Sequence, residues 1–198
     1  MLELLAPAGN LDAVIAAVQN GADAVYMGFG DGFNARRSAD NFTRESFAKA
    51  VRYCHIRGCK VYVTLNTLVG DREMEAAAAL AQQASDAGAD AILVQDLGLA
   101  RVLRDALPDI PLHASTQMSI HNLAGVEAAA EMGITRAVLS RELSLEQIRF
   151  ISQHASIETE VFVHGALCFC YSGQCYMSAL IGRRSGNRGE CGQPCRLK

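Results

Sequence analysis

Cysteines are concentrated near the C-terminal end of this chain, where five of the seven lie between positions 168 and 195. Converging thiolates of this kind suit an iron–sulfur cluster or a zinc ion. Structural zinc usually comes from short C-x₂₋₄-C pairs, so a longer first interval favours iron–sulfur, while spacing alone leaves zinc and free thiols open. Four of the five have the spacing C-x₆-C-x₁₅-C-x₃-C: Cys168, Cys175, Cys191 and Cys195. The fifth, Cys170, is either a competing ligand or a packed thiol.

A histidine just before these cysteines allows a second chemistry. His164 could serve as the base for a Cys168 or Cys175 nucleophile in a thiol peptidase. Such a dyad gives the other cysteines no role, and the H-E-x-x-H motif of metallopeptidases is absent. Peptide hydrolysis is therefore the alternative to a redox site.

Polar side chains recur just after the expected strands. In a (β/α) barrel the loops at the C-terminal ends of the strands form the mouth, where active sites lie. Asn66, Ser115 and Gln117 occupy such positions and could orient a polar ligand by hydrogen bonds.

Two arginines also follow expected strands. Arg36 and Arg141 could clamp a carboxylate or phosphate through paired N–H donors. An equally good interpretation of Arg141 is a surface ion pair with Glu142 or Glu146.

Short apolar runs alternate with alanine-rich amphipathic stretches along the chain, a pattern typical of βα units around a parallel sheet. The phrase Gly-Ala-Asp-Ala before two of these runs is an internal repeat of that unit. The expected strands are Leu2–Ala6, Ala24–Gly28, Lys60–Leu65, Ala91–Gln95, Leu112–Ser115, Arg136–Ser140 and Glu160–Val163.

Polar groups after nearly every strand favour an α/β fold of the (β/α)₈ TIM-barrel type over a doubly wound open sheet, which concentrates its site at one switch point. Such barrels need about 250 residues, and an eighth strand is missing, so the barrel ends after the seventh. We expect a barrel domain at 1–165 and a Cys/Gly/Arg-rich, irregular cluster-binding segment at 166–198. The chain is then a piece of a longer protein, or else a short natural relative.

Several residues have structural interpretations instead. Glu160 begins the seventh expected strand, at the end of a barrel that carries stability. Asn10 is expected to cap the first helix. Cys54 and Cys59 lie on or after a helix far from the cluster segment and are expected to pack as small apolar groups.

Composition places the chain among packed globular proteins, with 50% hydrophobic and 20% charged residues. Neither a secretory signal nor an 18-residue apolar run is present, which predicts a cytoplasmic protein without a membrane span. The net charge is −3, yet the last 16 residues hold five basic residues against one acidic residue, which suits an anionic partner.

The stretch from Glu160 to Ser178, E-V-F-V-H-G-A-L-C-x₄-G-Q-C-Y-M-S, resembles position by position the signature of the collagenase-like peptidase family, formerly filed among peptidases of unknown catalytic type. The resemblance covers the whole chain, from LLAPAGN and GADAVYMG through SRELSLEQI to SGNRGECGQPCR. It implies a bacterial protein with a barrel-like N-terminal domain followed by more protein.

Members that this chain resembles include RNA hydroxylases, which act on a tRNA wobble uridine with prephenate or on an rRNA cytidine, and hydroxylases of ubiquinone precursors. The segment after Tyr171 looks most like the rRNA-hydroxylating branch. The resemblance implies a four-iron four-sulfur cluster on Cys168, Cys175 and Cys191, with Cys195 or a residue farther downstream as the fourth ligand.

This resemblance implies an enzyme that hydroxylates an RNA base, in which the cluster activates or relays an oxygen donor. Arg36 and Arg141 would hold a small anionic co-substrate such as prephenate, and the polar residues at the mouth would orient the reacting ring. RNA contacts would come mostly from further protein. A thiol peptidase and a cluster-bearing assembly module without turnover are the alternatives.

Overall fold

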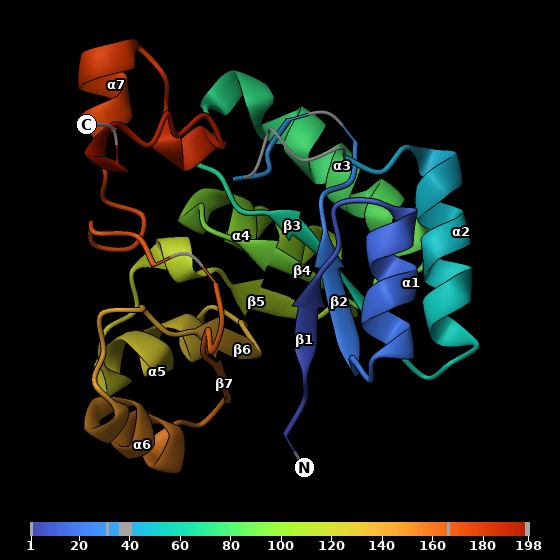
Figure 1. The fold of residues 1–198 in the computed structure, drawn as a ribbon, viewed down its shortest axis with the longest axis horizontal. Helices are drawn as coiled ribbons and strands as arrows, with labels where there is room; N and C mark the ends of the chain where they lie inside the picture. Colours follow the sequence, from blue (N-terminus) through green and yellow to red (C-terminus); the bar gives the residue numbers. More distant parts are fainter. Residues whose placement is uncertain (1, 31, 36–40, 166, 197–198) are drawn as a thin grey trace.

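The computed structural model describes residues 2–30, 32–35, 41–165 and 167–196. Its framework is one parallel sheet of seven strands whose spatial order follows the chain. The sheet curls so that one face is concave, and the helices cover the convex face (Figure 1). The strands are β1 (Leu5–Pro7), β2 (Ala24–Met27), β3 (Lys60–Leu65), β4 (Ala91–Val94), β5 (Leu112–Ala114), β6 (Arg136–Val138) and β7 (Glu158–Glu160).

Helices connect successive strands, and further short helices follow β7. The α-helices are α1 (Leu11–Gln19), α2 (Arg44–His55), α3 (Met74–Asp86), α4 (Leu97–Ala106), α5 (Leu123–Glu131), α6 (Leu145–His154) and α7 (Met177–Gly182). The 3₁₀ turns are η1 (Asp71–Glu73), η2 (Thr116–Met118), η3 (Gly186–Arg188) and η4 (Pro194–Arg196). Strictly sequential, parallel order confirms the TIM-barrel-like α/β prediction and excludes the doubly wound sheet, whose order reverses at a switch point.

The strands bury different residues on their two faces because side chains alternate along a strand. On β3, Val61, Val63 and Leu65 are fully buried against the helices. Tyr62 lies on the concave face, where it packs with Leu93 of β4. Most apolar burial is therefore on the convex side, and the concave side is left to polar residues at both of its ends.

The two outermost strands are displaced from their expected positions. The first was expected at Leu2–Ala6 and lies at Leu5–Pro7, and the last was expected at Glu160–Val163 and lies at Glu158–Glu160. The position of the last strand is set by its pairing with β6, because Arg136 of β6 lies opposite Glu158. The apolar run after β7 has strand-like composition and is nevertheless exposed. Glu160 consequently ends β7 instead of beginning it.

The segment after β7 is less irregular than expected. Its glycines suggested loops throughout, whereas α7 forms over a run of good helix formers. Arg183 ends that helix in the left-handed region, with φ 53°.

Local expectations about capping and packing are confirmed. The Asn10 side chain accepts the Ala13 N–H at 2.9 Å and caps α1. Cys54 and Cys59 are buried between α2 and the sheet, and burial raises the pKa of Cys54 to about 12.

An ion-pair network, which we call the basal cluster, lies at the N-terminal end of the concave face. Arg136 is 7% exposed and contacts carboxylates of Glu3, Glu158 at 2.6 Å and Glu160 at 3.5 Å. Glu3 also accepts the Tyr62 hydroxyl at 2.9 Å. Despite partial burial, these hydrogen bonds lower the pKa of Glu3 to about 2. The cluster links the start of β1 to β6 and β7, across the side on which no described strand joins β7 to β1.

His113 of β5 lies beside this cluster. Its ring packs edge-on against Tyr62, with centroids 4.9 Å apart, and the residue is 4% exposed. Burial, followed by the nearby Arg136 charge, lowers the pKa of His113 to about 3. The folded chain therefore holds this imidazole neutral.

Candidate functional site

The predicted polar residues of the mouth meet in the folded chain. The Asn66 carboxamide accepts the Ala35 N–H at 3.0 Å and donates to the Ser115 hydroxyl at 3.1 Å. Ser115 also accepts the Gln117 N–H at 3.4 Å. Because Ser115 Oγ accepts twice, its own proton is available to an acceptor in the mouth.

Two further polar atoms at the mouth have no hydrogen-bond partner among the described residues. Thr67 is 1% exposed and its Oγ1 is unpartnered. Gln95 is 7% exposed; its Nε2 donates to the Gln117 carbonyl at 3.3 Å, whereas its Oε1 has no donor. A buried polar group without a partner costs about 1–3 kcal/mol. Such atoms are typical of a surface that a polar ligand completes.

Ser172, between Cys170 and Cys175, anchors the cysteine-bearing segment to this mouth. The residue is fully buried. Its hydroxyl accepts from Arg141 Nε at 3.2 Å, its N–H donates to Glu142, and its carbonyl accepts the Ser119 hydroxyl. Burial tends to raise the pKa of Glu142, yet hydrogen bonds from its own backbone and from Ser172 lower it.

The next residue makes the close approach possible. Gly173 has φ +74°, and a Cβ there would lie 2.2 Å from the Gln117 carbonyl oxygen. Gln174 then donates to the Ser119 hydroxyl at 3.0 Å. The chain at 172–174 thus packs directly on the η2 turn that carries Gln117.

Arg188 of η3 forms a second anchor across the mouth. Its guanidinium donates to both Glu73 oxygens, at 2.7 and 3.0 Å, and to the Leu68 carbonyl at 2.9 Å. Together, the Ser172 and Arg188 anchors hold the segment between them, with α7, over the C-terminal ends of the strands (Figure 1).

The cysteines of the segment are free thiols, and two of them lie in contact. The side chains of Cys170 and Cys175 contact each other, and burial followed by the Cys175 thiol raises the pKa of Cys170. Cys191 accepts the Ser178 hydroxyl at 3.7 Å. Arg196, the neighbour of Cys195, donates to the Leu167 carbonyl beside Cys168 at 2.6 Å.

These cysteines have the chemistry of metal ligands, but in the described part of the chain their positions do not form a metal site. Thiols on a glycine-rich segment, with Cys168, Cys191 and Cys195 exposed, are suitable ligands. Within the described residues, however, no group of three or more Cys, His, Asp or Glu side chains is placed to hold a metal ion. The set fits a cluster in its chemistry, and its members would have to be drawn together on binding.

Among the described residues, Arg141 and His164 do not join the network of Asn66, Ser115 and Gln117. Arg36 lies outside the described residues. Arg141 pairs with neither Glu142 nor Glu146 and donates to Ser172. His164 is exposed, and no hydrogen bond joins it to a cysteine in the described part of the chain.

Ser172, Thr67 and Arg188 contribute to the site without having been predicted as catalytic or ligand residues. Thr67 directly follows Asn66 at a strand end, which is a signal that could have found it. Ser172 has no comparable signal, because its partners lie between 30 and 53 residues away in sequence.

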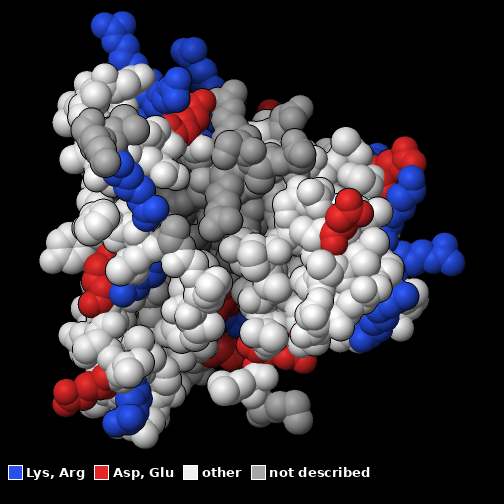
Figure 2. All heavy atoms as spheres, viewed as in Figure 1, with Lys and Arg blue, Asp and Glu red and all other residues white. Residues whose placement is uncertain are grey.

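Basic side chains are visible over the C-terminal segment, at the upper left of Figure 2. Arg183, Arg184 and Arg196 are exposed there. The described residues include no helix long and apolar enough to cross a membrane.

Comparisons with known proteins agree with this architecture. A model of peptidase family U32 matches residues 9–198. The 23S rRNA 5-hydroxycytidine C2501 synthase of Escherichia coli (strain K12) is 46% identical over 196 residues, which are 99% of this chain and 29% of that protein. The tRNA hydroxylation protein P1 of Bacillus subtilis (strain 168) is 41% identical over 194 residues, 98% of this chain and 46% of that protein. This chain thus spans less than half the length of either relative.

A solved structure described as that of the U32 peptidase Mk0906 has the same fold. Its TM-score is 0.70 at 17% identity, over 85% of this chain and 71% of that one.

Proposed function

The chain belongs to peptidase family U32, and we propose that it is part of an enzyme that hydroxylates an RNA base and that binds an iron–sulfur cluster through its C-terminal cysteines. Relatives at 46% and 41% identity are named for an rRNA hydroxycytidine and for tRNA hydroxylation, which supports RNA as the substrate class. Both rRNA and tRNA belong to that class, and a quinone precursor is the alternative substrate.

One observation carries the proposal: a segment with five cysteines is anchored over the strand ends, at the place where barrel enzymes hold their substrates. A thiol peptidase needs a Cys–His pair within hydrogen-bond reach, and His164 has no such contact among the described residues. The anchoring supports a redox site between the segment and the mouth.

In this proposal Cys168, Cys175, Cys191 and Cys195 are the cluster ligands. A four-iron four-sulfur cluster, when bound, supplies the redox chemistry that activates or relays the oxygen donor. The Arg196–Leu167 hydrogen bond links the neighbours of Cys195 and Cys168, and metal binding would draw the four thiols together.

The chain's own polar residues would orient the substrate. The Asn66 carboxamide is fixed from both sides, by Ala35 and by Ser115. Ser115 can donate its remaining proton to a carbonyl of the reacting ring, and Gln117 lies on the turn that contacts the cysteine segment. Arg141 acts through Ser172, so its role is to position the segment.

Metal analysis of anaerobically purified protein tests the cluster. We expect near-stoichiometric iron and acid-labile sulfide in the wild type and their loss in Cys175→Ala. Cys54→Ala, which changes a buried thiol in α2, is the matched control and should retain both. Zinc in place of iron, or equal iron in Cys175→Ala, would contradict the proposal.

Nucleoside mass spectrometry tests the reaction. RNA from cells that lack the gene should have lost one hydroxylated base, and the wild-type gene should restore it where Cys175→Ala does not. Restoration by the variant would remove the cysteine from the mechanism. Peptide cleavage by metal-free protein, abolished by alkylation, would instead establish the peptidase.

A further inference from the structure

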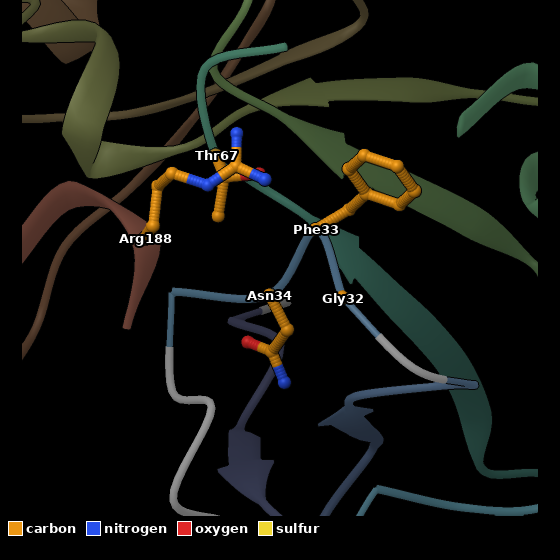
Figure 3. Close-up of a pocket in the computed structure, with 5 residues that line it drawn as sticks. All are labelled: Gly32, Phe33, Asn34, Thr67 and Arg188. Atoms are coloured by element: carbon orange, nitrogen blue, oxygen red, sulfur yellow. The ribbon is translucent and has the colours of Figure 1, made fainter. Parts of the chain in front are cut away.

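A small pocket opens at the mouth between the loops that follow β2 and β3. It measures about 140 Å³ and is lined by Gly32, Phe33, Asn34, Thr67 and Arg188 (Figure 3). We propose that this pocket binds a small carboxylate, held by the guanidinium of Arg188 and the hydroxyl of Thr67. The inference deepens the proposed function, on which it rests for the identification of this ligand as the anionic co-substrate.

Arg188 has one hydrogen-bonding edge left for a ligand. A guanidinium has five N–H donors. Glu73 and the Leu68 carbonyl take both donors of Nη1 and one of Nη2. Nε–H and the second Nη2–H have no acceptor among the described residues, and together they form the side-on fork that matches two carboxylate oxygens.

Thr67 independently indicates a ligand. Its side chain is almost completely buried, yet Oγ1 has no partner in the described part of the chain. Thr67 and Arg188 both line the pocket, and Figure 3 shows them above the loop that carries Gly32 and Asn34. A bound carboxylate would supply the acceptor that this hydroxyl lacks and would offset its desolvation cost.

The local charge favours a single carboxylate group at the fork over a phosphate group. Arg188 is already paired with Glu73, so the site as a whole is close to neutral. A carboxylate brings one negative charge, whereas a phosphate near pH 7 brings a second, which Glu73 repels.

The position of the pocket connects it to the cysteine segment. Gly186 begins the turn that carries Arg188, and a Cβ built on Gly186 would lie 3.8 Å from Cys191 Cβ and 3.9 Å from the Cys175 carbonyl. The turn that carries Arg188 therefore packs on the cysteine segment, and the same turn would connect a carboxylate held by Arg188 to the proposed redox site. This assigns to Arg188 and Thr67 the role that the sequence predicted for Arg36 and Arg141.

Backbone NMR titration of the 198-residue chain tests the inference, with propionate as the carboxylate probe at constant ionic strength. We expect saturable shifts of the Gly32, Phe33, Asn34 and Thr67 amides. Thr67→Val, which keeps the shape and removes the hydroxyl, and Arg188→Lys, which keeps the charge and removes the fork, should each weaken binding about tenfold. Arg184→Lys, an exposed arginine of the same segment, should bind as the wild type does.

Unchanged affinity in Thr67→Val would overturn the inference, as would shifts that map to exposed arginines. Inorganic phosphate is the second probe, and saturable binding of phosphate without propionate would also overturn it. Arg188→Lys can loosen the segment, so Thr67→Val, which touches neither anchor, decides the test. Binding is measured without iron or RNA, so a failed hydroxylase proposal and a failed pocket give separate results.

Discussion

The two ends of the concave face treat polar groups in opposite ways. At the N-terminal end, the buried Arg136 is surrounded by three carboxylates, and Glu3 binds Arg136, Lys60 and Tyr62 together. At the C-terminal mouth, Thr67 and Gln95 keep buried atoms without partners among the described residues. The N-terminal end pairs its charges with one another and links the two outer strands, although His113 Nδ1 and Glu160 Oε2 there also lack a hydrogen bond among the described residues. What distinguishes the mouth is that the unpartnered Thr67 lines a pocket, which a ligand can enter. Both ends belong to the same strands, so a residue's position along its strand decides which end it joins.

The largest expected effect is at the basal cluster. Arg136→Met leaves Glu3, Glu158 and Glu160 without their shared cation, and removal of one partner from a buried ion pair costs about 3–5 kcal/mol. Urea unfolding measures this loss as a lower midpoint. Arg101→Met, which breaks an exposed pair with Asp105, is the control and should cost less than about 1 kcal/mol. Equal losses in the two variants would mean that the basal cluster is not a special source of stability.

At the mouth, the next largest effect is expected from Gly173→Ala. Its Cβ would meet the Gln117 carbonyl, and the backbone has a positive φ, so the segment should detach from the mouth while the barrel stays folded. We expect about 30-fold lower protection of the Ser172 and Gln174 amides from hydrogen exchange, or about 2 kcal/mol.

Gly182→Ala is the matched control for this change, because a Cβ at Gly182 meets nothing within 4 Å. If the segment detaches and the unfolding midpoint stays unchanged, the mouth does not contribute to the stability of the barrel, as we expect. Global unfolding in Gly173→Ala would show instead that the mouth also carries the fold.

Stability should also depend on pH through the buried His113 beside the basal cluster. His113 has a pKa near 3 in the folded chain against about 6.5 when unfolded, so the unfolded state binds a proton first on acidification. Stability is therefore complete above pH 6.5 and falls between pH 6.5 and 3, by up to about 1.4 kcal/mol per pH unit. Burial raises the pKa of Glu160, which opposes this trend with the opposite sign.

Urea midpoints between pH 7 and 5 measure that slope. His113→Leu should flatten it whatever its absolute stability, since the readout is the change with pH. His154→Leu, at an exposed position of α6, is the control and should keep the wild-type slope. An unchanged slope in His113→Leu would assign the pH dependence to other groups.

The sequence predicted the parallel order and the mouth because both follow from local patterns. Alternating apolar runs define the βα units, and residues just after neighbouring strands must meet at one end of the sheet, as Asn66 and Ser115 do. The anchors depend on loop conformation instead. Arg188 and Glu73 are 115 residues apart, and Arg141 binds Ser172 in place of its acidic neighbours only because Gly173 lets the chain approach Gln117. No periodicity encodes such contacts.

The smallest expected effect is the difference in unfolding free energy between Thr→Val variants of two buried threonines that are three residues apart. Thr64 donates its hydroxyl to the Met27 carbonyl at 3.2 Å, whereas Thr67 Oγ1 has no partner among the described residues. Thr64→Val should therefore lose about 1 kcal/mol, while Thr67→Val should be neutral or up to about 1 kcal/mol more stable. Paired urea unfolding curves measure the difference, and an equal loss in both would mean that Thr67 is satisfied in the native state. A Thr67→Val chain that is stabler and binds propionate more weakly would show that the mouth gives up stability for ligand binding.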